Sequence, residues 1–250
     1  MMWLYSGLLR ELMVFRALVM VVSVNTLLLT SYILIFVSMG LEVYVSTVLA
    51  LLTILTSNIL SRFNVSIGNV RLDDEFRKAS MVRIGSKYLV QLVRFKTMNN
   101  VSLEFNLGGF LIPLTLSTSI LTYIASSQGA SALITTSLLV ITSALLINRV
   151  SVVVRGVGLA VPVVMVSLMV SLATMLVVMI LGSPHQLWLL SYVASYISVL
   201  IGVDIMNLGK VVVHNVRRVV VGGLNVYDAL SVIPASTTLI TYTVLKLLQM

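Results

Sequence analysis

Residues Leu187–Leu208 read LWLLSYVASYISVLIGVDIMNL, a run of 22 residues whose only charged side chain is Asp204. Its length matches the roughly 20 apolar residues that an α-helix needs to cross a bilayer. A second aspartate, Asp228, lies in the next apolar stretch, Leu224–Leu248. Because an ionisable side chain inside a membrane segment costs several kcal/mol, we interpret both aspartates as functional residues.

The composition of the whole chain points to the same environment. Hydrophobic residues make up 59% of the 250 residues, charged residues make up 10%, and the mean hydropathy is +1.10. These values lie far outside the range of soluble domains. They predict an all-α integral membrane protein that crosses the cell membrane several times.

Cysteine content and charge exclude several classes of function. The chain has no cysteine, which excludes disulfides and cysteine-based metal or nucleophile sites, and we expect no cofactor. The net charge of +8 suits contact with the anionic lipid of a bilayer. Because the positive charge is spread over the connections between apolar segments, we do not expect a nucleic-acid partner.

The sequence divides into three parts. Residues 1–60 should hold an interfacial anchor, Met1–Arg16, and a two-helix hairpin, whereas residues 61–105 form a polar insertion. Residues 106–250 should form a five-helix membrane core that contains both aspartates. The seven expected spans are about Ala17–Met39, Leu41–Ile59, Asn106–Ala125, Ala130–Ile147, Val157–Ile180, Leu187–Leu208 and Leu224–Leu248.

Three connections carry β-branched or alternating residues and are predicted to form strands. They are Ser61–Glu104, Asn148–Gly156 and Lys210–Val221, the last of which is expected to be a β-hairpin. Because unpaired strand edges at a membrane surface favour unwanted association, these strands should pair with one another. We therefore expect one small β-rich cap on the cytoplasmic surface.

The distribution of basic residues predicts the orientation. The N-terminal stretch carries two, and the connections after the second, fourth and sixth spans carry eight, two and three. Only Lys246 falls on the opposite side. Since cytoplasmic connections are enriched in lysine and arginine, the N-terminus is expected in the cytoplasm and the C-terminus outside.

This orientation places the two aspartates at a similar depth. Asp204 lies about four residues before the end of the descending sixth span, and Asp228 about four residues after the start of the ascending seventh, so each lies roughly 6 Å inside. Asp228 sits in a first helical turn, which favours a carboxylate, whereas Asp204 sits in a last turn, which disfavours one. The sequence thus predicts one ionised and one protonated carboxyl group, the pair that aspartic proteolysis requires.

A structural alternative stays open for both residues. Asp228, with Asn225 as a cap, would then only support a helix start, and Asp204 would bond a loop arginine such as Arg217 or Arg218.

The motifs AsnLeuGlyGlyPheLeuIlePro, IleGlyValAspIleMetAsnLeu and GlyGlyLeuAsnValTyrAsp resemble those of a prokaryotic membrane family, the domain of unknown function 1614. The resemblance covers most of the chain from Ser61 onward and supplies no reaction. The residues that match its pattern are Asn106, Gly108, Gly109, Pro113, Gly202, Asp204, Asn207, Gly222, Gly223 and Asp228. We predict that Asn106, Gly108, Gly109, Pro113, Gly222, Gly223 and Tyr227 bind substrate beside the aspartates.

A shorter resemblance, over about 60 residues, is to presenilins and signal peptide peptidases. Those proteases also place one aspartate near the cytoplasmic end of a descending helix and the other near the start of the next, and Tyr227–Asp228 is similar to their TyrAsp motif. Their GlyXaaGlyAsp and ProAlaLeu motifs are absent. The resemblance implies an intramembrane aspartyl protease that cleaves a transmembrane-helix substrate.

Two other classes of function fit the same residues. In an ion- or proton-coupled transporter or channel, the carboxylates would bind a cation beside the interrupted start of the third span. In a non-catalytic membrane scaffold, they would serve structure alone.

Overall fold

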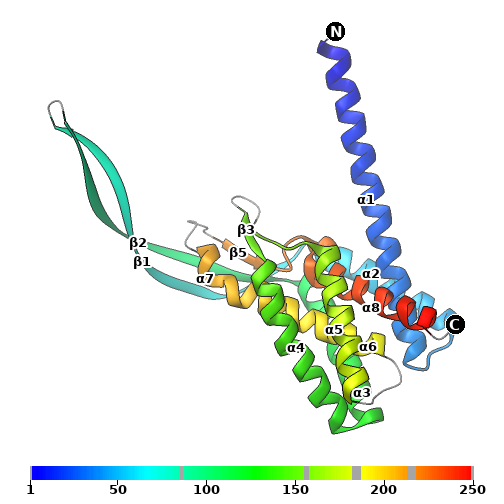
Figure 1. The fold of residues 1–250 in the computed structure, drawn as a ribbon. Helices are drawn as coiled ribbons and strands as arrows, with labels where there is room; N and C mark the ends of the chain where they lie inside the picture. Colours follow the sequence, from blue (N-terminus) through cyan, green and yellow to red (C-terminus); the bar gives the residue numbers. More distant parts are fainter. Residues whose placement is uncertain (1, 85–86, 155–157, 182–186, 213–217, 249–250) are drawn as a thin grey trace.

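The computed structural model describes residues 2–84, 87–154, 158–181, 187–212 and 218–248 (Figure 1). The chain is mostly helical, and six helices are long and apolar enough to cross a membrane: Met13–Ser38, Val43–Leu60, Leu107–Gln128, Ala130–Val150, Leu187–Gly209 and Ala229–Leu248. A seventh helix, Val163–Leu181, is also apolar over the stretch whose side chains are all described, Val163–Val177. The helices therefore indicate a multi-pass membrane protein, and six of the seven expected spans are found as long apolar helices among the described residues.

The first two helices form the expected hairpin. Helix α1 (Met2–Ser38) and helix α2 (Val43–Leu60) are joined by a tight turn in which Gly40 has φ 95°. Helix α1 continues through Arg16 without a break, so the described part of the expected interfacial anchor, Met1–Arg16, belongs to the same helix as the first span. Its position in the membrane interface stays a prediction. Figure 1 shows the first half of α1 projecting beyond the other helices.

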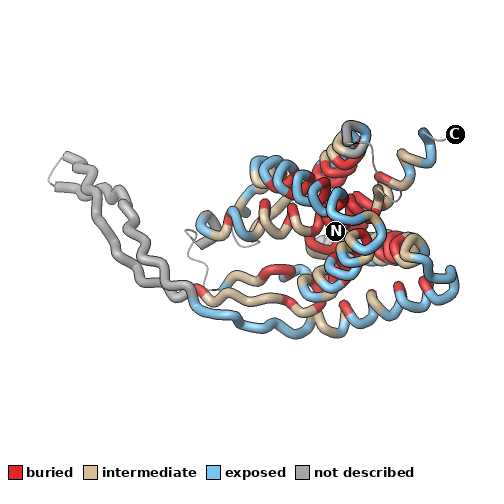
Figure 2. The backbone as a smooth tube through the Cα atoms, turned by 90° about the horizontal axis from the view of Figure 1, so that it is seen from below, coloured by how far each residue is buried: buried red, intermediate tan, exposed pale blue. Residues whose placement is uncertain are grey.

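The remaining helices pack around α6, which is the most deeply buried. They are α3 (Ile112–Gln128), α4 (Ala130–Val150), α5 (Val163–Leu181), α6 (Leu187–Val199), α7 (Met206–Val212) and α8 (Ala229–Leu248). In Figure 2 the buried residues lie where these helices meet, and the outer faces are exposed. Exposed leucine, valine and methionine side chains on α2, α4 and α5 suit contact with hydrocarbon.

The expected single cap is only partly correct. Strand β1 (Asn64–Ile84) pairs antiparallel with β2 (Lys87–Asn106), and β2 pairs in parallel with β5 (Arg218–Val221). Strands β3 (Val152–Val154) and β4 (Gly158–Ala160) instead form a second sheet of their own. The insertion is also not compact, since β1 and β2 extend from the bundle as a long ribbon (Figure 1).

Two further expectations about this region are wrong. The stretch Lys210–Val221 does not form a β-hairpin, because its first residues belong to α7, only Arg218–Val221 is a strand, and residues 213–217 lie outside the described chain. The last span begins at Ala229 and not at Leu224, because Asn225–Tyr227 forms a short 3-10 turn, η3.

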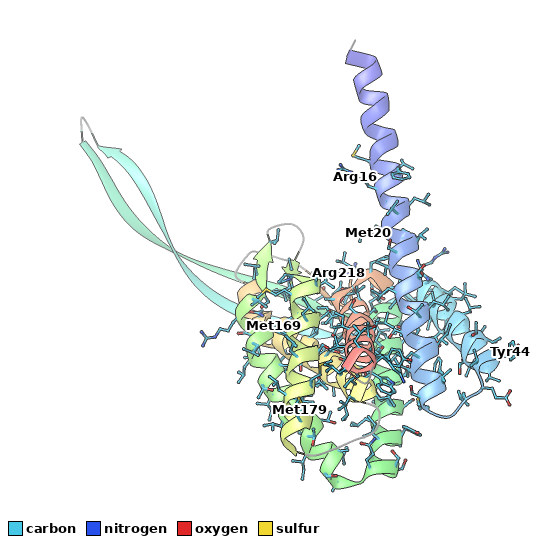
Figure 3. All side chains as sticks on the ribbon, turned by 45° about the vertical axis from the view of Figure 1, so that its right-hand side comes forward. Arg16, Met20, Tyr44, Met169, Met179 and Arg218 are labelled. Atoms are coloured by element: carbon cyan, nitrogen blue, oxygen red, sulfur yellow. The ribbon has the colours of Figure 1, made fainter. Side chains whose placement is uncertain are left out.

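The bundle has two distinct ends. Figure 3 shows Arg218 at the end that carries the strands, which we name the sheet end, and Met179 at the opposite end. Tyr44, at the start of α2, points away from the other helices into the surroundings and is 85% exposed. All five strands attach to helices at the sheet end, whereas the turns at Gly40 and Gly129 lie at the opposite end.

Candidate functional site

The third membrane segment begins with a distorted helical turn. Residues Leu107–Leu111 form a single π-helical turn, η1, before α3. The buried Asn106 side chain accepts a hydrogen bond from the Gly109 N–H at 2.7 Å and donates one to the Ser61 carbonyl at 2.7 Å. Asn106 thus attaches η1 to the end of α2. Such turns are rare and are frequently found at functional sites.

Glycines let three backbones meet at η1. A Cβ at Gly108 would overlap the Ser57 carbonyl oxygen of α2, and the Ser57 hydroxyl donates a hydrogen bond to the Gly108 carbonyl at 2.8 Å. Gly222, after β5, has φ 74°, and a Cβ there would lie 2.8 Å from the Gly109 carbonyl carbon. Both positions therefore require glycine for close approach.

Helix α6 ends in a second π-helical turn, η2 (Leu200–Ile205), which carries Asp204. Gly202 presses against α4, since a Cβ there would lie 2.5 Å from the Ala144 carbonyl oxygen. The Gly202 carbonyl accepts hydrogen bonds from the side-chain amides of Asn148 at 3.0 Å and Asn207 at 2.9 Å. Both π turns are therefore held by asparagine side chains.

Asp204 and Asp228 approach each other at the sheet end of α6. Both are half-buried, and their carboxyl groups lie near enough to interact electrostatically. Tyr196, two turns before Asp204 on α6, interacts with both carboxyl groups. Its hydroxyl donates a hydrogen bond to the Phe110 carbonyl in η1 at 3.1 Å. Tyr196 therefore links η1 to the two aspartates.

Asp228 immediately precedes α8 and caps it. Its Oδ1 accepts a hydrogen bond from the Leu230 N–H and its Oδ2 one from the Leu224 N–H, both at 3.1 Å. Burial raises the pKa of the Asp228 carboxyl above its ordinary value, while these two N–H groups act in the opposite direction. Asp228 thus has a structural role at the helix start, whatever else it does.

The alternative partner expected for Asp204 is not seen in the residues that the structure describes. Arg218 forms an ion pair with Glu104 across β5 and β2, and Arg217 lies in the gap 213–217. Within the described ranges, no hydrogen bond or ion pair of the Asp204 side chain is present. In the same ranges, no cluster of three histidine, aspartate or glutamate side chains could hold a metal ion.

The other residues predicted to bind substrate make contacts within the protein. The Tyr227 hydroxyl accepts a hydrogen bond from the Asn25 amide of α1 at 3.3 Å. Pro113 is buried at the start of α3, and a Cβ at Gly223 would lie 3.0 Å from the Val220 carbonyl oxygen. Their role in substrate binding stays a prediction.

Sequence reasoning missed Tyr196 and Asn148, which the structure places at the site. Tyr196 lies eight residues before Asp204, a spacing that keeps two side chains on a similar face of a helix, so helical periodicity could have indicated it. Asn148 stands near the end of an apolar span, where a buried amide often bonds another helix. The sequence indicated an interrupted start of the third span, where η1 lies, but no sequence signal identified η2.

Comparison with known proteins gives one match. No curated protein and no solved structure matches the chain. A family model described as a protein of unknown function, DUF1614, matches residues 58–240, which is more than half of the chain and includes η1, η2 and both aspartates. The chain therefore belongs to the DUF1614 family.

Proposed function

We propose that the protein is an intramembrane aspartyl hydrolase that cleaves transmembrane-helix substrates with Asp204 and Asp228. The observation that carries the proposal is that two half-buried carboxyl groups lie near enough to influence each other electrostatically. Among the described residues, no basic side chain neutralises either one. Two neighbouring carboxyl groups repel each other when both are ionised, so the pair retains one proton. The ionised group can then act as a base and the protonated group as an acid in one site.

The two carboxyl groups have different surroundings, which suggests different roles. Two backbone N–H groups fix the Asp228 carboxylate, so Asp228 is suited to take a proton from water as the base. The water oxygen then attacks the peptide carbonyl carbon. Asp204 is suited to give its proton to the departing nitrogen as the acid. Tyr196 is under the electrostatic influence of both carboxyl groups, and its hydroxyl donates a hydrogen bond to the Phe110 carbonyl. It can donate a hydrogen bond to the developing oxyanion only after it releases that carbonyl.

A groove beside η1 suits an apolar substrate. It has a volume of about 310 Å³ and lies between α2 and α3, both of which are membrane-spanning candidates. Its lining includes Leu52, Thr56 and Ile112, the last of which directly follows η1. A substrate helix that contacts this groove from the bilayer would reach the protein next to the turn that Tyr196 links to the aspartates.

We also propose that the sheet end faces the cytoplasm. Apart from Lys246 at the end of α8, the basic residues whose side chains are described are Arg16, Arg62, Arg149 and Arg218, and all four lie at or beyond this end of the helices. Figure 3 labels Arg16 and Arg218 on the same side of the bundle. The distribution is the one expected of a cytoplasmic surface. With α5 counted as a span, seven crossings place the C-terminus outside.

One observation favours a non-catalytic scaffold instead. Both oxygens of Asp228 are used in capping, so this carboxylate has a sufficient structural reason to be present. The scaffold and the hydrolase predict different results when the Asp228 carboxyl group is replaced by a neutral amide. Asparagine still caps a helix but cannot act as a base, so Asp228→Asn preserves a scaffold and stops a hydrolase.

The experiment is a cleavage assay in liposomes with a panel of single-span helices as substrates. The wild-type protein should cut at least one of them, and Asp204→Asn and Asp228→Asn should each stop the cut while inserting normally. Glu42→Gln is the matched control, because Glu42 precedes α2 at the opposite end and its side chain makes no capping bond. Cleavage that persists in either aspartate variant excludes the proposed mechanism.

A further inference from the structure

A row of buried tyrosines runs along the bundle away from the two aspartates. Tyr192 and Tyr196 lie one turn apart on α6 and have no exposed surface, and Tyr32 of α1 is 2% exposed. Tyr192 interacts electrostatically with Tyr32 and with Tyr196, and Tyr196 interacts with Asp204 and Asp228. Three buried tyrosines therefore lead from α1 through α6 toward the two aspartates.

The hydroxyls of this row are incompletely bonded. The Tyr192 hydroxyl is buried and lies beside that of Tyr32, yet it has no hydrogen bond of ordinary geometry. Among the described residues, buried hydroxyls without a partner also occur on four other helices: Ser31 on α1, Ser117 on α3, Ser143 on α4 and Ser231 on α8. An unsatisfied buried hydroxyl costs about 1–3 kcal/mol, so such groups usually bind an internal water.

The row reaches the end of the bundle opposite the sheet. Tyr32 lies six residues before Ser38, the last residue of α1, which is roughly 9 Å along a helix. There the indole N–H of Trp188 donates a hydrogen bond to the Ser38 hydroxyl at 2.7 Å, and the Tyr123 hydroxyl donates one to the Ser38 carbonyl at 3.3 Å. Polar groups therefore lie at this end of the bundle as well as at the aspartates.

We propose that this tyrosine row, with water between its hydroxyls, conducts protons between the aspartate pair and the end of the bundle opposite the sheet. A hydroxyl can accept a proton on a lone pair from one side and release its own proton to the other side. Each tyrosine therefore keeps its proton count, and rotation of the hydroxyl restores the starting state. The carboxyl groups of Asp204 and Asp228 bind the proton at the sheet end and release it to water there, since each residue keeps a partly exposed surface.

This activity is separate from the proposed hydrolysis, because it needs the hydroxyls of Tyr192 and Tyr196 and no substrate. An apolar ring would fill the same space in the bundle without the cost of burying a hydroxyl. The replacement of tyrosine by phenylalanine therefore interrupts the row with little change of shape.

The test uses the full-length protein in liposomes that contain a pH-sensitive dye, with a potassium diffusion potential driving protons inward. Wild-type vesicles should acidify at least fivefold faster than protein-free vesicles. Tyr192→Phe and the double variant Asp204→Asn with Asp228→Asn should each lower the protein-dependent rate at least fivefold. Tyr242→Phe, which changes a partly exposed tyrosine of α8 outside the row, should stay within twofold of wild type.

Two results would overturn the proposal. One is a wild-type rate equal to that of protein-free vesicles. The other is an acidification rate of Tyr192→Phe, or of the double aspartate variant, equal to that of Tyr242→Phe at the same protein content. If Tyr192→Phe does not fold, the double aspartate variant provides the test. Tyr192→Phe should retain substrate cleavage, so loss of conduction and loss of hydrolysis can be told apart.

Discussion

The replacement of Gly202 by alanine tests how closely η2 packs against α4. The new Cβ would lie 2.5 Å from the Ala144 carbonyl oxygen and 3.2 Å from the Ala144 carbonyl carbon. Carbon atoms at optimal separation are about 3.5–4.0 Å apart, so η2 must move by roughly 1 Å. Overpacking of this kind costs about 1–3 kcal/mol, and the movement also weakens the bonds from Asn148 and Asn207 to the Gly202 carbonyl.

Alanine also favours a helix by about 1 kcal/mol over glycine, and a matched control isolates this effect. Gly209 lies in α7, seven residues after Gly202, and no atom lies within 4 Å of its added Cβ. We expect Gly209→Ala to raise the melting temperature in detergent slightly. Gly202→Ala should lower it by about 2–4 °C for each kcal/mol lost. If Gly202→Ala melts at or above wild type, the close packing of η2 on α4 is wrong.

Three further predictions concern the helix cap formed by Asp228, the hydrogen bonds of Asn106 to η1, and the orientation in the membrane. Asp228→Ala removes the acceptor of two N–H groups and should destabilise the protein by about 0.5–2 kcal/mol, whereas Asp228→Asn should keep its stability. Equal melting temperatures of these two variants would contradict the capping role. Asn106→Ala leaves the Gly109 N–H without its acceptor and should lower the free energy of unfolding by about 1–3 kcal/mol in the same melting assay. An unchanged melting temperature would show that η1 does not depend on this hydrogen bond. An impermeant maleimide applied to intact cells should label Ser127→Cys but label Val152→Cys only after permeabilisation, and the reverse pattern would invert the proposed orientation.

The sequence was sufficient for the parts of the fold that depend on local composition. Hydropathy located six spans, because a helix must present apolar side chains over its full length to cross a bilayer. The alternating residues of Asn64–Ile84 and Lys87–Asn106 likewise indicated strands. The sequence did not show that Met1–Arg16 and the first span form one continuous helix, because a boundary was placed where aromatic and charged residues give way to apolar ones. Good helix formers continue through Arg16.

Features that depend on tertiary contacts could be predicted only in part. Pairing between the polar insertion and Lys210–Val221 was expected and occurs as β2 with β5, although these residues lie more than 100 positions apart. The expected pairing of Asn148–Gly156 with the same sheet does not occur in the described residues, because β3 finds its partner locally in β4. Each π turn exists because a glycine lets it press against a neighbouring helix and an asparagine bonds the backbone that it leaves free. The sequence presented these glycines and asparagines only as unusual residues, and it did not say which backbone each would meet.

The electrostatic coupling of Asp204 and Asp228 is tested most directly by an infrared titration of their carboxyl bands. Spectra of wild type, Asp204→Asn and Asp228→Asn are recorded in lipid over the same pH range. If the two groups act as a pair, each substitution moves the titration midpoint of the carboxyl that remains, because coupled groups titrate together. The wild-type spectrum then differs from the sum of the two single-carboxyl spectra. Unchanged midpoints and additive spectra would contradict the paired site.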